Sequence, residues 1–279
     1  NMRKILEDAR EGRYAVGAFN IVNQLTAKAA VEAAEALETP IILQTSVKTV
    51  KQFGIKEMMC FLKPIAEKAK VAVAIHLDHS TDVDFTLACL ENGWSSVMYD
   101  GSKLPLSENI KNTKQIVVAA RKYDATVEGE LGAIVGVEDD IVVEEGNSAL
   151  ANPDDCREYL KKTQVDAFAP AVGTAHGVYK GEINIDYDLF EHINAFSKSP
   201  LVLHGGTGLS TETFHRLIAL GAAKVNISTA IKIAYCQGMY AYTKENSNEN
   251  DPLKLDAFVK DKVKTVVTKH ICLFSLLEK

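Results

Sequence analysis

Three histidines stand at the ends of three strand-like segments that lie far apart in the sequence. His79 ends VAVAIHLDH (71–79), His176 lies in GTAHG, and His204 lies in PLVLHGG (200–206). Neutral imidazole is the commonest protein ligand for zinc, and three protein ligands with one open position are typical of a catalytic zinc site. Spacings of this length exclude a single helix or a zinc finger. The three histidines can act together only in a fold that brings many strand ends to one place.

A carboxylate directly precedes the first of these histidines. Asp78 and His79 are neighbours, and neighbouring side chains of a strand point to opposite faces. At a strand end the chain turns, so both side chains can reach the same side. We therefore expect Asp78 to serve as an acid or base beside a metal ion on His79. His76 alternates with Asp78, and a structural place in the wall of the sheet is the plainer interpretation for it.

Strand-like and helix-like segments alternate along the whole chain. The eight strand candidates are AVGAFN (15–20), PIILQTS (40–46), VAVAIHLDH (71–79), SSVMYDGS (95–102), ATVEGELG (125–132), AFAPAVG (167–173), PLVLHGG (200–206) and AKVNIST (223–229). Helical spacing of apolar residues fills segments 24–37, 105–123 and 211–221 between them. Eight such units predict a parallel sheet closed into a (β/α)8 TIM barrel. An open doubly wound sheet is the alternative, but the GxGxxG expected after its first strand is absent.

Polar residues gather at one end of nearly every predicted strand. They are Asn20, Ser46, Asp78, His79, Asp100, Glu130, His176, His204, Asn226, Ser228 and Thr229. The active site of a TIM barrel lies at the carboxyl ends of its strands. Any single Asn, Asp or Ser there could instead cap the following helix, but histidine is a poor cap. The three histidines therefore favour a functional site at this end of the barrel.

The turns after the last two predicted strands fit an anion. HGGTGLS (204–210) is rich in glycine and precedes a helix, and NIST (226–229) follows the eighth strand. Glycines let backbone N–H groups approach a phosphate, and a helix N-terminus adds partial positive charge. Loops in these two places are the usual phosphate site of the barrel. A plain tight turn is the alternative interpretation.

The connection after the fifth strand is unusually long. GELGAIVGVEDDIVVEEG (129–146) carries glycines and acids, and long connections are often functional lids. Glu138 or Asp139 could bring an acid or base over a substrate, although a solvated acidic loop would look the same. No lysine stands at the carboxyl end of a predicted strand, and Lys224 lies at the start of the eighth. This argues against Schiff-base chemistry and favours a carbonyl polarised by metal.

Composition limits the class of protein. The chain has 279 residues, 47% of them hydrophobic, and a net charge of −6. These values predict one domain over 1–279 and give no sign of a nucleic-acid partner. No apolar run approaches the roughly 20 residues of a membrane span, and the charged N-terminal segment does not resemble a secretory signal. Asn1 before Met2 looks like an expression-tag remnant, and five scattered cysteines suit the cytoplasm.

A family resemblance rests on motifs in a fixed order. HLDH, VMYDGS, VEGELG, GTAHGVYKGE and LVLHGGTG follow one another between YAVGAFN (14–20) and KVNIST (224–229). With these motifs the chain closely resembles the zinc-dependent class II ketose-bisphosphate aldolases, which include the fructose- and tagatose-1,6-bisphosphate enzymes. The resemblance implies a lyase that reversibly cleaves a ketose (bis)phosphate to dihydroxyacetone phosphate and an aldehyde. We expect a small-molecule sugar phosphate as its partner and a homodimer or homotetramer.

The resemblance also assigns roles to individual residues. It implies that His79, His176 and His204 bind one Zn²⁺, with Glu130 and Asp100 as accessory ligands. A monovalent cation is a second candidate ion. Asp78 would handle the aldehyde oxygen, and Glu138 would be the mobile proton carrier that acts at C1. The implied substrate-binding residues are Asn20, Ser46, Gly177, Gly205, Gly206, Thr207, Asn226, Ile227, Ser228 and Thr229.

Four departures from the family pattern concern the acceptor end and the loop. Ser228 stands where well-known members carry Asp or Asn, SVKT (46–49) replaces a commoner Ser-x-Gly, and Val135 replaces a glycine. No arginine follows Arg216, so a C-terminal arginine that could clamp a distal phosphate is missing. Lysines could substitute only as point charges. Two alternatives therefore stay open: an aldolase whose acceptor carries no second phosphate, and a catalytically silent paralogue that binds sugar phosphates.

Overall fold

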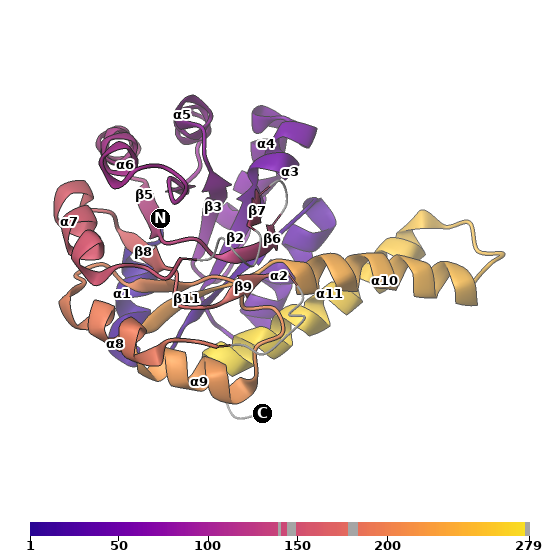
Figure 1. Cartoon of the computed structure of the whole chain (residues 1–279). Helices are drawn as coiled ribbons and strands as arrows, with labels where there is room; N and C mark the ends of the chain where they lie inside the picture. The colour runs from indigo at the N-terminus through magenta and orange to yellow at the C-terminus, as the bar shows by residue number, and fades with distance from the viewer. Residues whose placement is uncertain (139–140, 144–148, 178–183, 277–279) are drawn as a thin grey trace.

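Eight parallel strands close into a barrel whose outer side is covered by helices (Figure 1). The computed structural model describes residues 1–138, 141–143, 149–177 and 184–276, without the side chains of 135–138, 141–143 and 176. The barrel order is β1-β11-β10-β8-β5-β4-β3-β2, in which β1 pairs with both β2 and β11. This is the (β/α)8 TIM barrel that the alternation of segments predicted.

All eight predicted strands form the barrel. They are β1 (Val16–Asn20), β2 (Ile41–Ser46), β3 (Val73–Ser80), β4 (Ser96–Tyr99), β5 (Thr126–Leu131), β8 (Ala167–Pro170), β10 (Leu201–Leu203) and β11 (Ala222–Ile227). The helices are α1 (Arg3–Gly12), α2 (Gln24–Ala36), α3 (Val47–Phe53), α4 (Ile55–Lys68), α5 (Val83–Glu91), α6 (Leu106–Ala120), η1 (Arg121–Tyr123), α7 (Pro153–Thr163), α8 (Tyr187–Phe196), α9 (Thr211–Ala219), α10 (Thr229–Glu245) and α11 (Pro252–Phe274).

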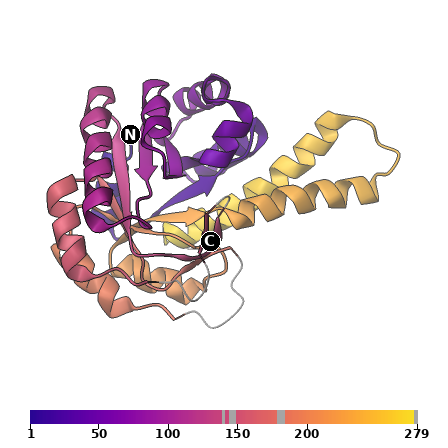
Figure 2. The same cartoon turned by 45° about the horizontal axis from the view of Figure 1, so that its top comes forward.

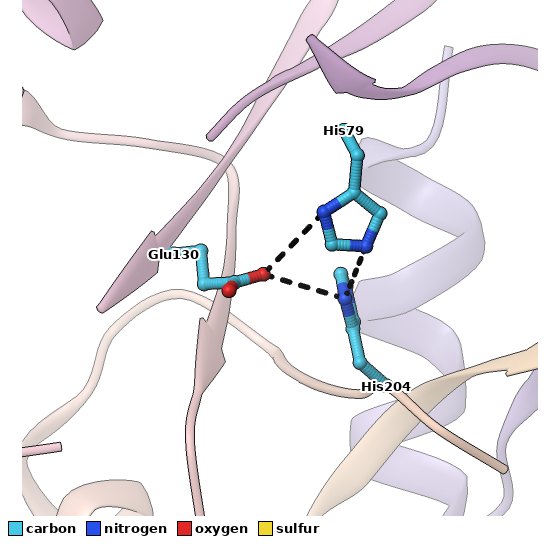
Figure 3. Close-up of side chains that lie close together, drawn as sticks. All are labelled: His79, Glu130 and His204. Atoms are coloured by element: carbon cyan, nitrogen blue, oxygen red, sulfur yellow. Dashed lines mark hydrogen bonds and ion pairs between the residues drawn. The ribbon is translucent and has the colours of Figure 1, made fainter. Parts of the chain in front are cut away.

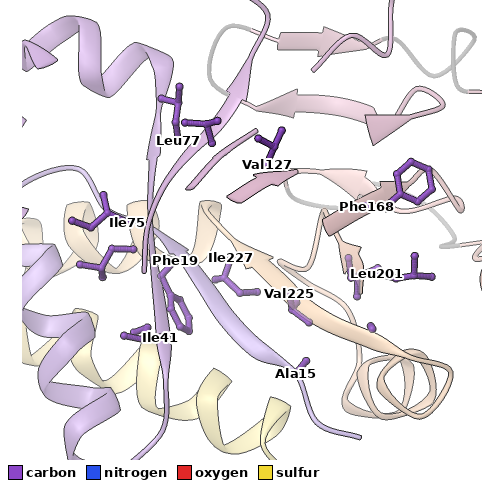
Figure 4. Close-up of a cluster of buried hydrophobic side chains, with 14 of the residues drawn as sticks. Ala15, Phe19, Ile41, Ile75, Leu77, Val127, Phe168, Leu201, Val225 and Ile227 are labelled. Carbon is purple, nitrogen blue, oxygen red and sulfur yellow. The ribbon is translucent and has the colours of Figure 1, made fainter. Parts of the chain in front are cut away.

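Two apolar layers hold the barrel. The larger lies between strands and helices, where residues such as Phe19, Leu77 and Phe168 are fully buried (Figure 4). The smaller lies at the amino ends of the strands, where Met2 and Leu6 of the α1 region pack on small strand residues. Because α1 closes this end with apolar side chains, the opposite end of the barrel is left for the strand-end polar residues.

Local sequence signals set the ends of several helices. Ser210 caps α9, and its hydroxyl accepts from the backbone N–H of Thr213. Gly221 follows this helix with φ +111°, a conformation that favours glycine. Asn23 forms a capping box with Thr26 at the start of α2. Capped helices of this kind place several of the strand-to-helix turns, and with them polar residues at the carboxyl ends.

The long connection after β5 is not simply a loop. Its described part contains β6 (Val135–Glu138) and β7 (Ile141–Val143), which pair antiparallel, and β6 pairs parallel with β9 (Ala175–His176). The valines and isoleucine of this segment favour strands, and the acidic residues between them masked that pattern. Asp139 lies outside the described residues.

The helices α10 and α11 form an extended hairpin that projects from the barrel (Figures 1 and 2). The inner part of α11 packs against α2 and β1, with Val263, Val267 and Phe274 buried. Tyr240 and Leu253 on the projecting part are 68% and 74% exposed. No helix in the described part of the chain is long and apolar enough to cross a membrane.

Candidate metal and catalytic centre

A backbone irregularity at the end of β3 brings two adjacent side chains to the same site. His79 has φ +48°, a left-handed conformation that is uncommon for a residue other than glycine. The pairing of β3 with β4 shifts register between Leu77 and Ser80. Asp78 and His79 are consequently both buried and both engage side chains of other strands. This is the turn that we expected at the end of the strand, where both side chains can reach the same side.

His79, Glu130 and His204 come together from β3, β5 and the turn after β10 (Figure 3). The distance from Nδ1 of His204 to Nε2 of His79 is 3.0 Å, and to Oε2 of Glu130 it is 3.4 Å. One potential ligand atom from each of the three residues lies within 4.8 Å of the others. Two imidazoles and a carboxylate at these separations are a suitable donor set for zinc.

Two further carboxylates hold the outer nitrogens of the two imidazoles. Asp100 lies 3.0 Å from Nδ1 of His79, and Oε1 of Glu128 lies 2.8 Å from Nε2 of His204. When an outer nitrogen donates its proton to a carboxylate, the inner nitrogen presents a lone pair. A cation between the two inner nitrogens would satisfy both, and carboxylate–histidine–metal arrangements of this kind are general in metal sites. Asp100 therefore lies behind His79 rather than within the three-residue group.

The protonation states of the buried groups also fit a cation. Burial lowers the pKa of His204 to about 4, so the imidazole is neutral near pH 7. Burial alone would raise the pKa of Glu128, but the Lys224 charge and the hydrogen bond with His204 hold it well below its usual value. Asp100 is likewise held ionised, since its contacts with His79 and Ser102 lower its pKa against the effect of burial. A neutral His204 imidazole near the ionised carboxylates of Glu128 and Asp100 is a state that suits a metal ion.

Two of the predicted site residues have side chains outside the described part of the structure. These are His176, predicted as the third zinc ligand, and Glu138, predicted as the mobile proton carrier. Their backbones are described: β6, which ends at Glu138, pairs with β9, and Gly136 lies opposite His176. The two roles stay predictions, and the backbone brings the two segments side by side.

Asp78 lies within a set of amides from three other strands. Asn20 donates from Nδ2 to Oδ2 of Asp78 at 2.8 Å, and Asn226 donates to Oδ1 at 3.5 Å. Gln44 in turn donates to Oδ1 of Asn20 at 2.9 Å, which fixes the orientation of that amide. Asp78 is 1% exposed. The carboxylate is thus held by donors beside His79, as a positioned acid or base would need.

The glycine turn and the start of α10 also lie together, as predicted. The N–H of Gly206 donates to the carbonyl of Asn226 at 3.3 Å, and Thr207 Oγ1 accepts from the N–H of Ala230 at 3.4 Å. Gly205 has φ +69°, and a Cβ there would overlap the carbonyl oxygen of Ala175. The turn therefore needs glycine both for its conformation and for its close packing.

The remaining predicted substrate residues have mixed environments. Ser46 caps α3, because its hydroxyl accepts from the N–H of Thr49. Helix capping was the alternative to a functional role that the sequence left open for serines at strand ends. Ile227 is a fully buried core residue, so only its backbone can face a ligand. Gly177 has φ +90° and directly follows β9. A substrate contact at any of these positions stays a prediction.

The whole chain matches one protein family. Residues 1–279 match the model of the family described as fructose-bisphosphate aldolase class-II. The chain belongs to the class II fructose-bisphosphate aldolases. It is therefore an aldolase, a carbon–carbon lyase, as the order of its motifs indicated. The alternative of a catalytically silent paralogue is set aside.

Solved structures of other proteins agree with this family. The chain is 28% identical to the YdjI aldolase of Escherichia coli K12, with a TM-score of 0.84, over 98% of this chain and 96% of that one. A candidate fructose-1,6-bisphosphate aldolase of Coccidioides immitis is 25% identical, with a TM-score of 0.88, over 97% and 94% of the two chains. The fructose-bisphosphate aldolase of Campylobacter jejuni, 20% identical over 98% and 93% with a TM-score of 0.83, shares the fold.

The sequence pattern assigned no site role to three interior residues of this aldolase. Glu128, Lys224 and Gln44 are all fully buried and lie next to predicted site residues. Glu128 alternates with Glu130 on β5, so both glutamates point into the barrel. Lys224 is the third residue of β11, and a charged residue within a buried strand was the signal that could have identified it.

Proposed function

We propose that this aldolase is zinc-dependent and cleaves a ketose phosphate to dihydroxyacetone phosphate and an aldehyde. The observation that carries the proposal is the convergence of His79, His204 and Glu130, with a carboxylate behind each imidazole. His176 joins these ligands in the proposal. A zinc ion held there would polarise the ketose carbonyl and stabilise the negative charge that develops on its oxygen.

Proton transfer is assigned to two carboxylates of the chain. Asp78 removes the proton from the hydroxyl of the acceptor half during cleavage and returns it to the aldehyde oxygen during condensation. Its two amide neighbours, Asn20 and Asn226, hold the carboxylate in place for this transfer. Glu138 returns a proton to the hydroxyl-bearing carbon of the donor half, C1 of dihydroxyacetone phosphate, during cleavage and removes that proton during condensation. A positioned acid or base is worth about 10²–10⁴-fold in rate.

The donor phosphate is assigned to the turn after β10 and to the start of α10. The backbone of Gly205 to Thr207 and of 226–229 lines this site, with the N-terminal end of α10 behind it. Ser228 supports this assignment, because its hydroxyl is buried and has no hydrogen-bond partner among the described residues. A phosphate oxygen would satisfy it.

The far end of the substrate is assigned a group other than a second phosphate. All but one of the six arginines are engaged elsewhere: Arg3 and Arg121 bind Asp166, Arg10 binds carbonyls at the end of α8, Arg157 stacks on Phe196, and Arg216 stacks on Tyr187. The remaining one, Arg13, directly follows α1 at the opposite end of the barrel. A bidentate phosphate clamp at the carboxyl ends is therefore lacking in the described chain.

A comparison of substrates tests this part of the proposal. The quantity is kcat/KM for fructose 1,6-bisphosphate, tagatose 1,6-bisphosphate and the matching ketose 1-phosphates, measured with saturating Zn²⁺. We expect a ketose 1-phosphate to be cleaved faster than either bisphosphate. A clear preference for a bisphosphate at about 10⁶ M⁻¹s⁻¹ or above, the range of efficient enzymes, would refute it. A lysine such as Lys48 or Lys51 would then have to hold the second phosphate.

A further inference from the structure

The barrel interior holds a lysine for which the reaction described above has no role. Lys224 on β11 is fully buried, and among the described residues it is the sole lysine or arginine in the interior. Its Nζ lies 2.8 Å from Oε2 of Glu128 and donates to Oδ1 of Asn226 at 2.8 Å. Burial of an unpaired ammonium would cost considerable free energy, and these two contacts offset that cost. They also connect Lys224 to the groups of the proposed site.

The first contact leads to the metal centre. Glu128 receives Lys224 on Oε2 and His204 on Oε1, the latter at 2.8 Å from Nε2. A carboxylate has two acceptor oxygens, so it can hold both groups at once. Lys224 thereby fixes the carboxylate that orients the imidazole of a proposed metal ligand.

The second contact leads to the proposed acid–base group. An ammonium can only donate, so the amide oxygen of Asn226 must face Lys224. The amide nitrogen of Asn226 then faces Asp78, where it donates at 3.5 Å. With the opposite orientation the amide oxygen would face a carboxylate. Lys224 thus removes the ambiguity that an asparagine side chain otherwise has.

We infer that Lys224 is a positioning residue that orients His204 through Glu128 and orients the Asp78 neighbour Asn226 directly. This inference rests on the proposed function for the role of Asp78, but its first half concerns metal affinity alone. The ammonium of Lys224 on β11 would in this way align two groups from different parts of the barrel, His204 after β10 and Asp78 on β3.

A simpler role for Lys224 predicts the opposite change in metal affinity. If the lysine only balanced charge, its removal would make the site more negative and a divalent cation would bind more tightly. If it positions Glu128, its removal frees that carboxylate, and metal binding weakens. Loss of an outer partner of a metal ligand typically costs about 10–100-fold in affinity. The sign of the change therefore separates the two roles.

Three variants and one control test the inference. Lys224→Met removes the contacts with Glu128 and Asn226. Glu128→Gln leaves one acceptor oxygen, so the side chain can no longer accept from both His204 and Lys224. The double variant removes the buried charge pair as a unit, which leaves no unpaired charge to destabilise the fold. Lys162→Met is the control, since it breaks a 2.7 Å ion pair with Glu158 on the surface of α7. Each protein is assayed for Zn²⁺ affinity by chelator competition without substrate, for thermal unfolding, and for kcat and KM at saturating Zn²⁺.

The positioning role predicts a distinct pattern across these measurements. Zn²⁺ affinity should fall at least about tenfold in both single variants and in the double variant. The double variant should regain thermal stability relative to Lys224→Met but should not regain Zn²⁺ affinity. At saturating Zn²⁺, kcat should fall further in Lys224→Met than in Glu128→Gln, with KM changed less than kcat. The control should match the wild-type protein.

Two results would overturn the inference. One is tighter Zn²⁺ binding by Lys224→Met, and the other is a double variant with wild-type affinity, which would mean a purely structural role. If Lys224→Met does not fold, the double variant and Glu128→Gln still decide the question. A wild-type protein that binds Zn²⁺ but cleaves no ketose phosphate would refute the proposed function while the affinity comparison still tests Lys224.

Discussion

The side chains of the centre obtain their chemistry from their neighbours. His79 and His204 each have a carboxylate on the outer nitrogen, and Asp78 has an amide on each oxygen. These partners come from different strands, so their spacing along the sequence gives little indication of them. The ligand types were predictable from single residues at strand ends. Lys224 stood out as a charged residue within a buried strand, but its pairing with Glu128 was not predictable, because a buried polar pair is defined only by its three-dimensional contacts.

Replacement of Asp78 by alanine should separate metal binding from catalysis. We expect Asp78→Ala to keep its Zn²⁺ and to lose about 10²–10⁴-fold in the rate of carbon–carbon cleavage. Exchange of the C1 proton of dihydroxyacetone phosphate with solvent should fall less, because that step is assigned to Glu138. The measurements are metal content, cleavage rate and isotope exchange on the same preparation. An equal loss in both reactions would show that the assignment of the two carboxylates is wrong.

At the scale of helices and strands, most of the elements that position the site were predictable from the sequence. All eight barrel strands were predictable from short runs of Val, Ile and Ala, and the cap at Ser210 was predictable from its residue type. The strands β6 and β7 were not, since their acidic residues suggested a loop. At His79 the sequence predicted a turn but not its left-handed conformation. That conformation accompanies a register shift between β3 and β4, and strand register cannot be read from local sequence.

The glycine turn after β10 should not tolerate a side chain. Gly205→Ala places a Cβ against the carbonyl of Ala175 at a φ of +69°, so we expect lower stability and a raised KM for the ketose phosphate. Gly238→Ala in α10 is the matched control. Its Cβ would meet neighbours no closer than 3.5 Å, and alanine in a helix interior should add about 0.5–1 kcal/mol. Urea unfolding and steady-state kinetics of both variants measure the difference. Wild-type stability and KM in Gly205→Ala would contradict this account of the turn.

At the scale of the whole molecule, the metal centre joins strands from opposite parts of the barrel. His79, Glu130 and His204 belong to units that begin near residues 73, 126 and 201, so one ion would hold three distant parts of the chain. Composition predicted a single domain and gave no sign of nucleic-acid binding. It could not give the number of subunits, because a surface shared between copies leaves no periodic signal. A homodimer or homotetramer and a cytoplasmic location therefore stay predictions.

Zn²⁺ should stabilise the folded protein as a whole. A free ion at a concentration of 100 times its Kd, bound only by the folded state, adds about 2.7 kcal/mol to the free energy of unfolding. For a domain of 279 residues this corresponds to a rise in Tm of about 4–5 °C. We expect this rise when Zn²⁺ is added to the chelator-stripped protein. His204→Ala should show no such rise. Equal Tm values with and without Zn²⁺ in the wild-type protein would argue against a metal ion in the barrel.

The most direct test is the release of dihydroxyacetone phosphate from ketose phosphates by protein stripped of metal. The account predicts that stripping lowers the rate by at least about 100-fold, the scale of a lost oxyanion-stabilising contact, and that Zn²⁺ restores it. Borohydride added with substrate should not inactivate the protein, because Lys224 is tied to Glu128 and Asn226 and forms no Schiff base. Full activity in the stripped protein, or inactivation by borohydride through a modified lysine, would contradict a metal-dependent aldolase.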